Sequence, residues 1–262
     1  MRAKPSILPS LLSRFLARIG DGDEAAQIEP ILEKLHSALL GGSSCLQASD
    51  FPEEFSSLEE NFAIGPPDSV KPLVLAPEGN LYLRRYFEYE QSLATLLLRL
   101  ANNRSEEVSS STLSRLNDYF GKRDDQMAAA RIAMTKGVSI VTGGPGTGKT
   151  YLAVGVIAAL LAENPELSIA LAAPTGKAAH RMRESIENNL RSFPLEPEVA
   201  SRFPTDAKTI HRLLRPLPPS IHFRRNQETP LVADVVLVDE SSMIDLPLMA
   251  KLLQALKPEA RL

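Results

Sequence analysis

The chain has 262 residues, a length that predicts about two domains, and its 29 Lys and Arg against 32 Asp and Glu leave it weakly acidic. The single cysteine, Cys45, excludes an intramolecular disulfide and a multi-cysteine zinc site, and it favours a reducing cytoplasm. No apolar run approaches the roughly 20 residues of a membrane-spanning helix, so no membrane partner is expected.

Residues 1–115 are predicted to form a small, mostly helical N-terminal domain with one β-hairpin. In chain order, the pattern predicts helices over 6–19 and 24–40, an irregular connection over 43–70, a hairpin of strands 73–75 and 81–83, and a helix over 86–100. A polar, Ser-rich stretch over 102–114 is expected to be a linker. The domain holds 11 Lys and Arg against 16 Asp and Glu and no catalytic constellation, which favours contact with a protein over contact with DNA.

Residues 116–262 alternate between apolar strand-like runs and helical patterns, which predicts an α/β domain with a parallel sheet. In chain order, we expect a helix capped by Asp124 or Asp125, a strand over 138–141, a helix from about 149, a strand over 167–173, a helix over 178–190, a short helix capped by Thr209, a strand over 235–239 and a helix over 247–256. This part holds 18 Lys and Arg against 16 Asp and Glu, a balance that does not by itself indicate nucleic acid.

Residues 143–150 match the phosphate-binding loop G-x-x-x-x-G-K-[ST]. The residues of this phosphate loop are Gly143, Gly144, Pro145, Gly146, Thr147, Gly148, Lys149 and Thr150. Glycines let the backbone turn tightly and point its N–H groups at phosphate oxygens, and the helix that follows adds the positive end of its dipole. Lys149 is placed to reach the β- and γ-phosphates, and the Thr150 hydroxyl to bind Mg²⁺. An accidental Gly-rich turn is disfavoured because a strand-like run precedes the loop and a helix pattern follows it.

An apolar run from Leu231 ends in two adjacent acids, Asp239 and Glu240. Mg²⁺ prefers oxygen ligands and keeps several waters, so a carboxylate at a strand end near a phosphate loop suits it. We therefore interpret Asp239 as a Mg²⁺ residue and Glu240 as the group that orients or deprotonates the attacking water. Acids on the solvated rim of a strand are the alternative, which the phosphate loop upstream makes less attractive.

Three further features have a functional and an ordinary interpretation. The amide of Gln126 can donate to and accept from the edge of adenine, or it is a solvated helix residue. Thr175-Gly176-Lys177 follows a strand and resembles an anion-binding turn, or it is a plain connection into a helix. His211 and Arg212 are surface residues by default and phosphate contacts if this sheet edge faces DNA.

Four stretches occur in the order found in one helicase family. They are Gly-Gly-Pro-Gly-Thr-Gly-Lys-Thr, Ala-Ala-Pro-Thr-Gly-Lys-Ala-Ala, Thr-Ile-His-Arg-Leu-Leu, and Val-Val-Leu-Val-Asp-Glu-Ser-Ser-Met-Ile-Asp-Leu-Pro. Residues 116–262 thus resemble the RecD family, the α subunits of exodeoxyribonuclease V, which are superfamily-one helicases of the 5′→3′ branch. The N-terminal part resembles the family more loosely, through residues 72–86 and the helix that follows.

The resemblance implies ATP and Mg²⁺ as cofactors and a RecA-like phosphate-loop domain. It implies Lys149 and Thr150 for phosphates and Mg²⁺, Asp239 for Mg²⁺, Glu240 as catalytic base and Gln126 for adenine. It also implies contacts to single-stranded DNA from Pro174, Thr175, Gly176, Lys177, Thr209 and His211. By the same resemblance, the N-terminal domain docks on a RecC-like subunit in a complex that also holds a RecB-like subunit and repairs double-strand breaks.

The sequence departs from the family in three ways. Ser follows Asp-Glu where Ala is more frequent, and Tyr151 stands where Thr is common. The family also continues with a Gly-Asp-x-x-Gln motif and a second ATPase-like domain that supplies arginines for the γ-phosphate. We therefore expect these 262 residues to be an N-terminal part with an incomplete motor domain, which binds ATP weakly and does not unwind DNA. The alternatives are a stand-alone RecD-like helicase and a mainly structural assembly subunit.

Overall fold

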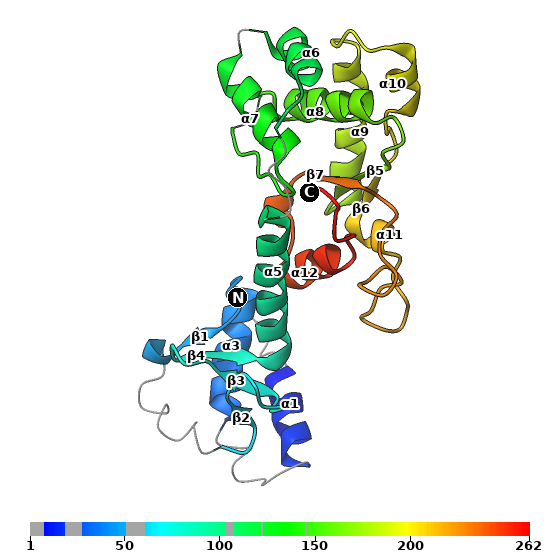
Figure 1. The fold of residues 1–262 in the computed structure, drawn as a ribbon. Helices are drawn as coiled ribbons and strands as arrows, with labels where there is room; N and C mark the ends of the chain where they lie inside the picture. Colours follow the sequence, from blue (N-terminus) through cyan, green and yellow to red (C-terminus); the bar gives the residue numbers. More distant parts are fainter. Residues whose placement is uncertain (1–7, 19–27, 51–60, 103–106, 122, 145) are drawn as a thin grey trace. The chain divides into compact units, whose positions relative to one another are not determined.

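The computed structural model describes residues 8–18, 28–50, 61–102, 107–121, 123–144 and 146–262. These fall into two compact units, Met1–Ser92 and Leu93–Leu262, and each is described by itself (Figure 1). The division lies within helix α5 (Arg84–Asn102). The domain boundary predicted between residues 115 and 116 stays a prediction. None of the helices in the described ranges is long and apolar enough to cross a membrane.

The first unit packs two helices against a small sheet. The helices are α1 (Leu8–Ala17) and α3 (Glu29–Leu40), and the four-stranded sheet has the order β1 (Leu46–Gln47), β4 (Asn80–Leu83), β3 (Leu73–Leu75), β2 (Ile64–Gly65). A short 3-10 helix, η1 (Ala48–Asp50), follows β1. The predicted hairpin is confirmed as the antiparallel pair β3–β4, in register at Val74 and Tyr82. β1 and β2 lie in the stretch expected to be irregular, where two-residue strands leave no periodic signal.

The second unit is built on a parallel sheet with the order β6-β5-β7. Its elements, in chain order after α5, are α6 (Ser110–Phe120), α7 (Asp124–Thr135), α8 (Lys149–Glu163), β5 (Ile169–Ala173), α9 (Gly176–Leu190), α10 (Pro197–Arg202), β6 (Ala207–Thr209), α11 (Ile210–Leu214), β7 (Val235–Val238), η2 (Ser241–Met243) and α12 (Leu246–Gln254). The predicted parallel α/β sheet is thus confirmed.

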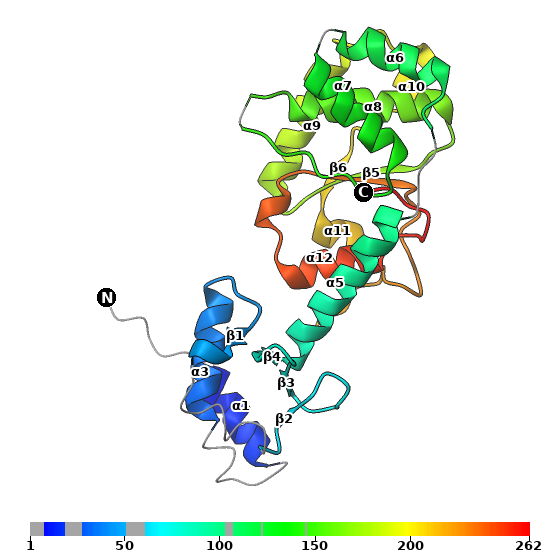
Figure 2. The same ribbon diagram turned by 60° about the vertical axis from the view of Figure 1, so that its left-hand side comes forward.

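Helices cover both faces of this sheet, as Figures 1 and 2 show. Successive strand residues point to opposite faces, so Leu171 and Val235 pack in one core with α6, α7, α8 and α9. Ala172 and Val236 pack in the other core, with α11, α12 and the part of α5 after Leu93. Burial on both faces explains why the strands are continuous apolar runs rather than alternating ones.

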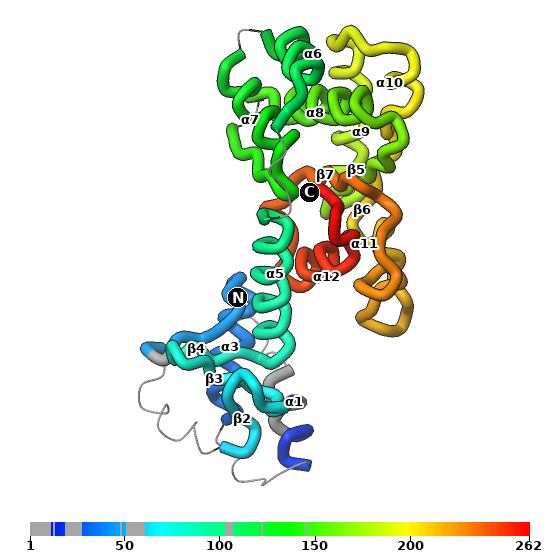
Figure 3. The backbone as a smooth tube through the Cα atoms, viewed as in Figure 1, coloured from blue at the N-terminus to red at the C-terminus, as the bar shows by residue number. Residues whose placement is uncertain are grey.

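The expected strand over 138–141 is wrong, because residues 138–144 form no strand. Ser139 N–H donates to the Leu262 carbonyl and Leu262 N–H to the Gly137 carbonyl, both at 2.9 Å. Beyond this pair, Ile140 is 81% exposed and Val141 is 43% exposed. A strand needs a hydrogen-bonded partner along its length. Among the described residues, only the last residues of the chain pair with this stretch, and they run beside β7 (Figure 3).

Two helix starts also differ from expectation. Residues 110–114, taken from their serines as linker, are the first turns of α6, because the Ser109 side chain accepts the Thr112 N–H as an N-cap. Residues 103–106 of that predicted linker lie outside the described residues. Helix α7 is capped by Arg123 without a side-chain bond, so Asp124 and Asp125 lie in its first turn, where their charge suits the helix dipole.

Candidate nucleotide-binding site and sheet edge

The phosphate loop turns on two glycines in the left-handed region. Gly146 has a φ of 76° and Gly148 a φ of 83°, conformations that residues with a Cβ adopt only at a cost. Gly148 is also the N-cap of α8, and its carbonyl accepts the Leu152 N–H at 2.9 Å. The loop therefore ends at the N-terminus of a helix, where backbone N–H groups favour the binding of an anion. Pro145 lies outside the described residues.

The Lys149 side chain folds back into this loop. Its Nζ donates to the carbonyls of Gly143 at 2.7 Å and Gly144 at 2.9 Å. The Thr147 hydroxyl donates to the same Gly144 carbonyl at 2.9 Å. A Cβ on Gly143 would lie 2.8 Å from that hydroxyl oxygen, so a side chain there would require the Thr147 side chain to move. The ammonium group is thus held at the loop, where it can exchange carbonyl oxygens for phosphate oxygens.

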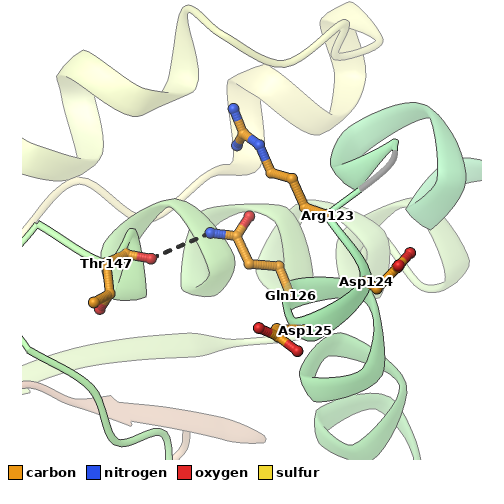
Figure 4. A pocket seen from close by; sticks show the side chains of 5 residues that line it. All are labelled: Arg123, Asp124, Asp125, Gln126 and Thr147. Atoms are coloured by element: carbon orange, nitrogen blue, oxygen red, sulfur yellow. Dashed lines mark hydrogen bonds between the residues drawn. The ribbon is translucent and has the colours of Figure 1, made fainter.

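Gln126 reaches the phosphate loop from the first turn of α7. Its Nε2 donates to the Thr147 carbonyl at 3.3 Å, and a Cβ on Gly148 would lie 2.6 Å from that nitrogen. The Oε1 atom is buried and has no hydrogen-bond partner, a state that is rare unless a function uses it. Figure 4 shows the amide nitrogen directed at Thr147 and the amide oxygen directed away from it.

An open pocket of about 470 Å³ lies at this junction. It is lined by Arg123, Asp124, Asp125, Gln126 and Thr147 (Figure 4). This volume falls in the usual range of small-molecule sites. The pocket and the phosphate loop share Thr147, so the two adjoin.

The acidic pair lies at the carboxyl end of β7. Asp239 N–H donates to the Ala172 carbonyl at 3.0 Å, which fixes Asp239 beside the end of β5. Asp239 Oδ1 accepts the Glu240 N–H at 2.9 Å, and Glu240 has a left-handed backbone with φ 52°. Such a conformation is strained for a glutamate and is found most often where function requires it. The carboxylate of Asp239 and the hydroxyl of Thr150 are oxygen donors of the kind Mg²⁺ prefers.

The predicted DNA residues lie at the same edge of the sheet. Thr175 caps α9 by accepting the Ala178 N–H at 3.1 Å, and Thr209 caps α11 by accepting the Arg212 N–H at 3.2 Å. Because Ala173 pairs with Thr209 in parallel strands, the strand ends that lead into α9 and α11 are neighbours. Pro174 is half-buried, whereas Gly176, Lys177 and His211 are exposed. The His211 ring lies 5.7 Å from the ring of Phe223.

The structure thus forms two groups of predicted residues. Gln126 joins the phosphate loop, while Asp239, Glu240 and the predicted DNA residues share the carboxyl edge of the parallel sheet, the usual ligand edge of such folds. Within the part of the chain that the structure describes, no hydrogen bond or ion pair joins the two groups. No cluster of three or more metal-binding side chains occurs in that part either.

Comparison with known proteins places this geometry in a family. The model of an AAA domain matches residues 126–262, slightly more than half of the chain. The chain belongs to this AAA domain family. Membership implies nucleotide use.

Named relatives refine the placement. The chain is similar to the RecBCD enzyme subunit RecD of Mycolicibacterium smegmatis, at 40% identity over 202 residues, which cover 73% of this chain and 35% of the relative. It is similar to RecD of Haemophilus influenzae, at 44% over 157 residues (56% and 24%), and to the ATP-dependent RecD2 DNA helicase of Deinococcus radiodurans, at 35% over 192 residues (70% and 23%). The chain thus spans about a third or less of these relatives, and its resemblance to RecD-type helicases is confirmed.

Sequence reasoning assigned no role to two residues beside the phosphate loop. Arg123 lines the pocket but lies just before the matched residues 126–262. Tyr151 follows the phosphate loop, and the Arg123 Cζ lies 4.5 Å from the centre of its ring. A stack between residues far apart in the chain has no periodicity or motif that could reveal it.

Proposed function

We propose that this chain is the nucleotide-binding part of a RecD-like subunit that moves 5′→3′ on single-stranded DNA at the expense of ATP. One observation carries the proposal: the phosphate loop opens α8, and an Asp-Glu pair ends β7, within an AAA domain whose named relatives include RecD subunits and a RecD2 helicase. The full protein would act in a helicase and nuclease complex for double-strand break repair.

Each residue of the site has a proposed role in this function. Lys149 exchanges the carbonyls of Gly143 and Gly144 for the β- and γ-phosphates, and the loop N–H groups with the α8 N-terminus share the charge. Thr150 and Asp239 supply oxygen ligands to Mg²⁺, which would neutralise charge on the phosphates. Glu240, held by its left-handed backbone, orients or deprotonates the attacking water.

We propose that single-stranded DNA crosses the carboxyl edge of the sheet. Lys177 is exposed at the start of α9, and its neighbours Thr175 and Gly176 leave backbone and hydroxyl groups near the same surface. Thr209 and His211 lie at the next strand end. Contacts of this kind attach phosphates without reading sequence, as a motor requires.

The N-terminal residues 1–115 are proposed to dock on a RecC-like subunit in a complex with a RecB-like subunit. Their acidic balance supports this, and the names of several relatives describe them as RecBCD subunits. The RecD2 relative supports the second candidate, a helicase that works alone. Capture of the chain by a purified RecC-like subunit supports docking, and the absence of any complex would favour the stand-alone form.

ATP titration of the 262-residue chain with Mg²⁺ tests the nucleotide site. Lys149→Ala should lower the affinity for ATP roughly tenfold or more, because a charged hydrogen-bond donor to phosphate is lost. Lys208→Ala is the matched control, since Lys208 forms an ion pair with Asp206 at the surface and its loss removes the same charge. Equal affinities in the Lys149→Ala variant and the unmodified chain would contradict the proposed role of Lys149.

Binding to labelled single-stranded DNA tests the sheet edge. Lys177→Ala should weaken binding about equally for all sequences and reduce its salt dependence by about one counterion. Affinity that is unchanged at low salt would remove Lys177 from the proposed DNA path.

A further inference from the structure

The pocket beside the phosphate loop has a wall that no role described so far uses. Arg123 is exposed at the N-cap of α7, three residues before Gln126, and lines the pocket with it. Its backbone is fixed, because its N–H donates to the Phe120 carbonyl at 3.1 Å and its carbonyl accepts the Met127 N–H at 2.9 Å. Its side chain therefore starts from a fixed backbone position and lines the same pocket as Gln126, whose buried Oε1 has no hydrogen-bond partner.

The guanidinium rests on an aromatic ring that is itself immobilised. Arg123 Cζ lies 4.5 Å from the centre of the Tyr151 ring, well within the range of cation–π stacking. The Tyr151 hydroxyl donates to the Tyr119 carbonyl at 2.8 Å, and its ring lies 4.5 Å from that of Phe193 at 30°. The centre of the Phe120 ring lies 6.0 Å from that of Tyr151, with the two rings at 75°. Tyr151 is thus a rigid support, so it restricts the orientation of the planar group stacked on it.

The charges around the pocket favour an uncharged planar ligand over a phosphate. Asp124 and Asp125 line the same space as Arg123, and carboxylates repel a triphosphate. Among the described residues, no ion pair joins the Arg123 guanidinium to either acid, so its charge and flat face stay available for a ligand. A planar guanidinium stacks well on a conjugated ring, and the base of a nucleotide is such a ring.

We propose that Arg123, held on Tyr151, is the stacking wall for the base of the bound nucleotide. This assignment rests on the proposed nucleotide site and adds to it a positioning residue outside the phosphate loop. The triphosphate lies on the phosphate loop, the base lies on the Arg123 guanidinium, and Gln126 faces the edge of the base. Tyr151 acts through Arg123 by fixing its plane.

Titration with two ligands separates base stacking from phosphate binding. The unmodified chain and its variants are titrated with ATP and, separately, with tripolyphosphate, which carries the phosphates without a base. Arg123→Ala should weaken ATP binding about three- to thirtyfold and leave tripolyphosphate binding unchanged. Arg123→Lys should lose as much as Arg123→Ala, because an ammonium group keeps the charge but has no flat face. Arg131→Ala, on the same helix, is the control for the loss of charge.

Two variants of Tyr151 provide a second test of the stack. Tyr151→Leu removes the support and should weaken ATP binding in the same direction, whereas Tyr151→Phe keeps the ring and should retain most of the affinity. Thermal unfolding of each variant, measured without ligand, shows whether the fold is intact.

The outcomes are distinct. An equal loss for ATP and tripolyphosphate in Arg123→Ala would make Arg123 a phosphate contact and overturn the inference. A drop in unfolding temperature with unchanged ATP affinity would make the stack purely structural and overturn it as well. ATP binding that Lys149→Ala abolishes and Arg123→Ala leaves intact would overturn this inference alone. Absence of ATP binding by the unmodified chain would overturn the proposed nucleotide site together with it.

Discussion

Arg84 of the first unit and two cations of the second unit, Lys149 and Arg123, have opposite kinds of contacts. In the first unit, Arg84 donates to the carbonyls of Lys71 at 2.7 Å, Pro67 at 2.9 Å and Pro66 at 3.3 Å, and to the Ser69 hydroxyl at 2.9 Å. It thereby closes one loop of the backbone. In the second unit, the Lys149 ammonium donates to the carbonyls of Gly143 and Gly144 in its own turn, and the Arg123 guanidinium lies on a ring.

The comparison separates structural from functional polar groups. A guanidinium that satisfies several buried or half-buried carbonyls stabilises a fold, and its removal leaves those carbonyls without partners. A cation at a helix N-terminus or over a rigid ring has contacts that a ligand can replace or extend. By this criterion Arg84 is a scaffold arginine, whereas Lys149 and Arg123 are available to a ligand.

The largest effect on stability is expected from a substitution of Gly137, which packs closely against the last turns of α5 in the second unit. A Cβ on Gly137 would lie 2.2 Å from the Leu100 carbonyl oxygen, which belongs to the last turns of α5. Gly137→Ala should therefore destabilise the second unit by about 3 kcal/mol, since backbone must move. Hydrogen exchange in peptides from residues 93–262 measures this loss. Gly176→Ala, whose Cβ would meet nothing within 4 Å, is the control, and equal losses in both variants would contradict the packing of α5 in this unit.

A smaller effect is expected at the scaffold arginine. Arg84→Ala should lower the free energy of unfolding of the first unit by about 2 kcal/mol, because four hydrogen bonds of the guanidinium are lost. ATP affinity should not change. Arg85→Ala is a close control, because the neighbouring Arg85 is exposed and its guanidinium lies 5.9 Å from the Tyr86 ring centre. Exchange rates in residues 61–92 report the difference, and similar rates in the two variants would show that Arg84 is dispensable.

The sequence predicts much of the second unit because its features are local. β5 and β7 are short apolar runs buried on both faces, and the phosphate loop is a contiguous motif. Thr175 and Thr209 act as helix caps, and a Thr before a helix is a local signal. The Asp-Glu pair can be predicted as a site from its position directly after a strand.

What could not be predicted depends on partners distant in the chain. Residues 138–141 have strand-like composition, yet their pairing depends on what lies beside them, which composition does not encode. The serines at 109–111 suggest a linker, although Ser109 in fact begins a helix whose apolar face meets α8. The stack of Arg123 on Tyr151 requires the two helices α7 and α8 to be packed first.

The smallest effect concerns acid stability in the second unit. Burial alone would raise the pKa of Asp234, but hydrogen bonds from Lys257 at 2.7 Å and from the Ser168 N–H at 2.9 Å lower it overall. Because the folded pKa is depressed, this stabilisation is present above the unfolded pKa of about 3.9 and is lost as the pH falls through the folded pKa.

Asp234→Asn should therefore lower the free energy of unfolding by about 0.5 kcal/mol near neutral pH. The value is small because Asp234 and its partner Lys257 are both partly exposed. The difference in the free energy of unfolding between this variant and the unmodified chain should shrink as the pH falls below about 4. Urea unfolding across this pH range measures it, and a constant difference at all pH values would show that the charge of Asp234 is not involved.

The division of labour between the two units is tested most directly by hydrogen exchange of the whole chain with and without ATP and Mg²⁺. We expect slower exchange of amides in residues 143–150 and 239–240 on addition of the nucleotide, and unchanged exchange in residues 28–50 and 61–92. Protection that is absent from residues 143–150, or equally strong in the first unit, would contradict this division.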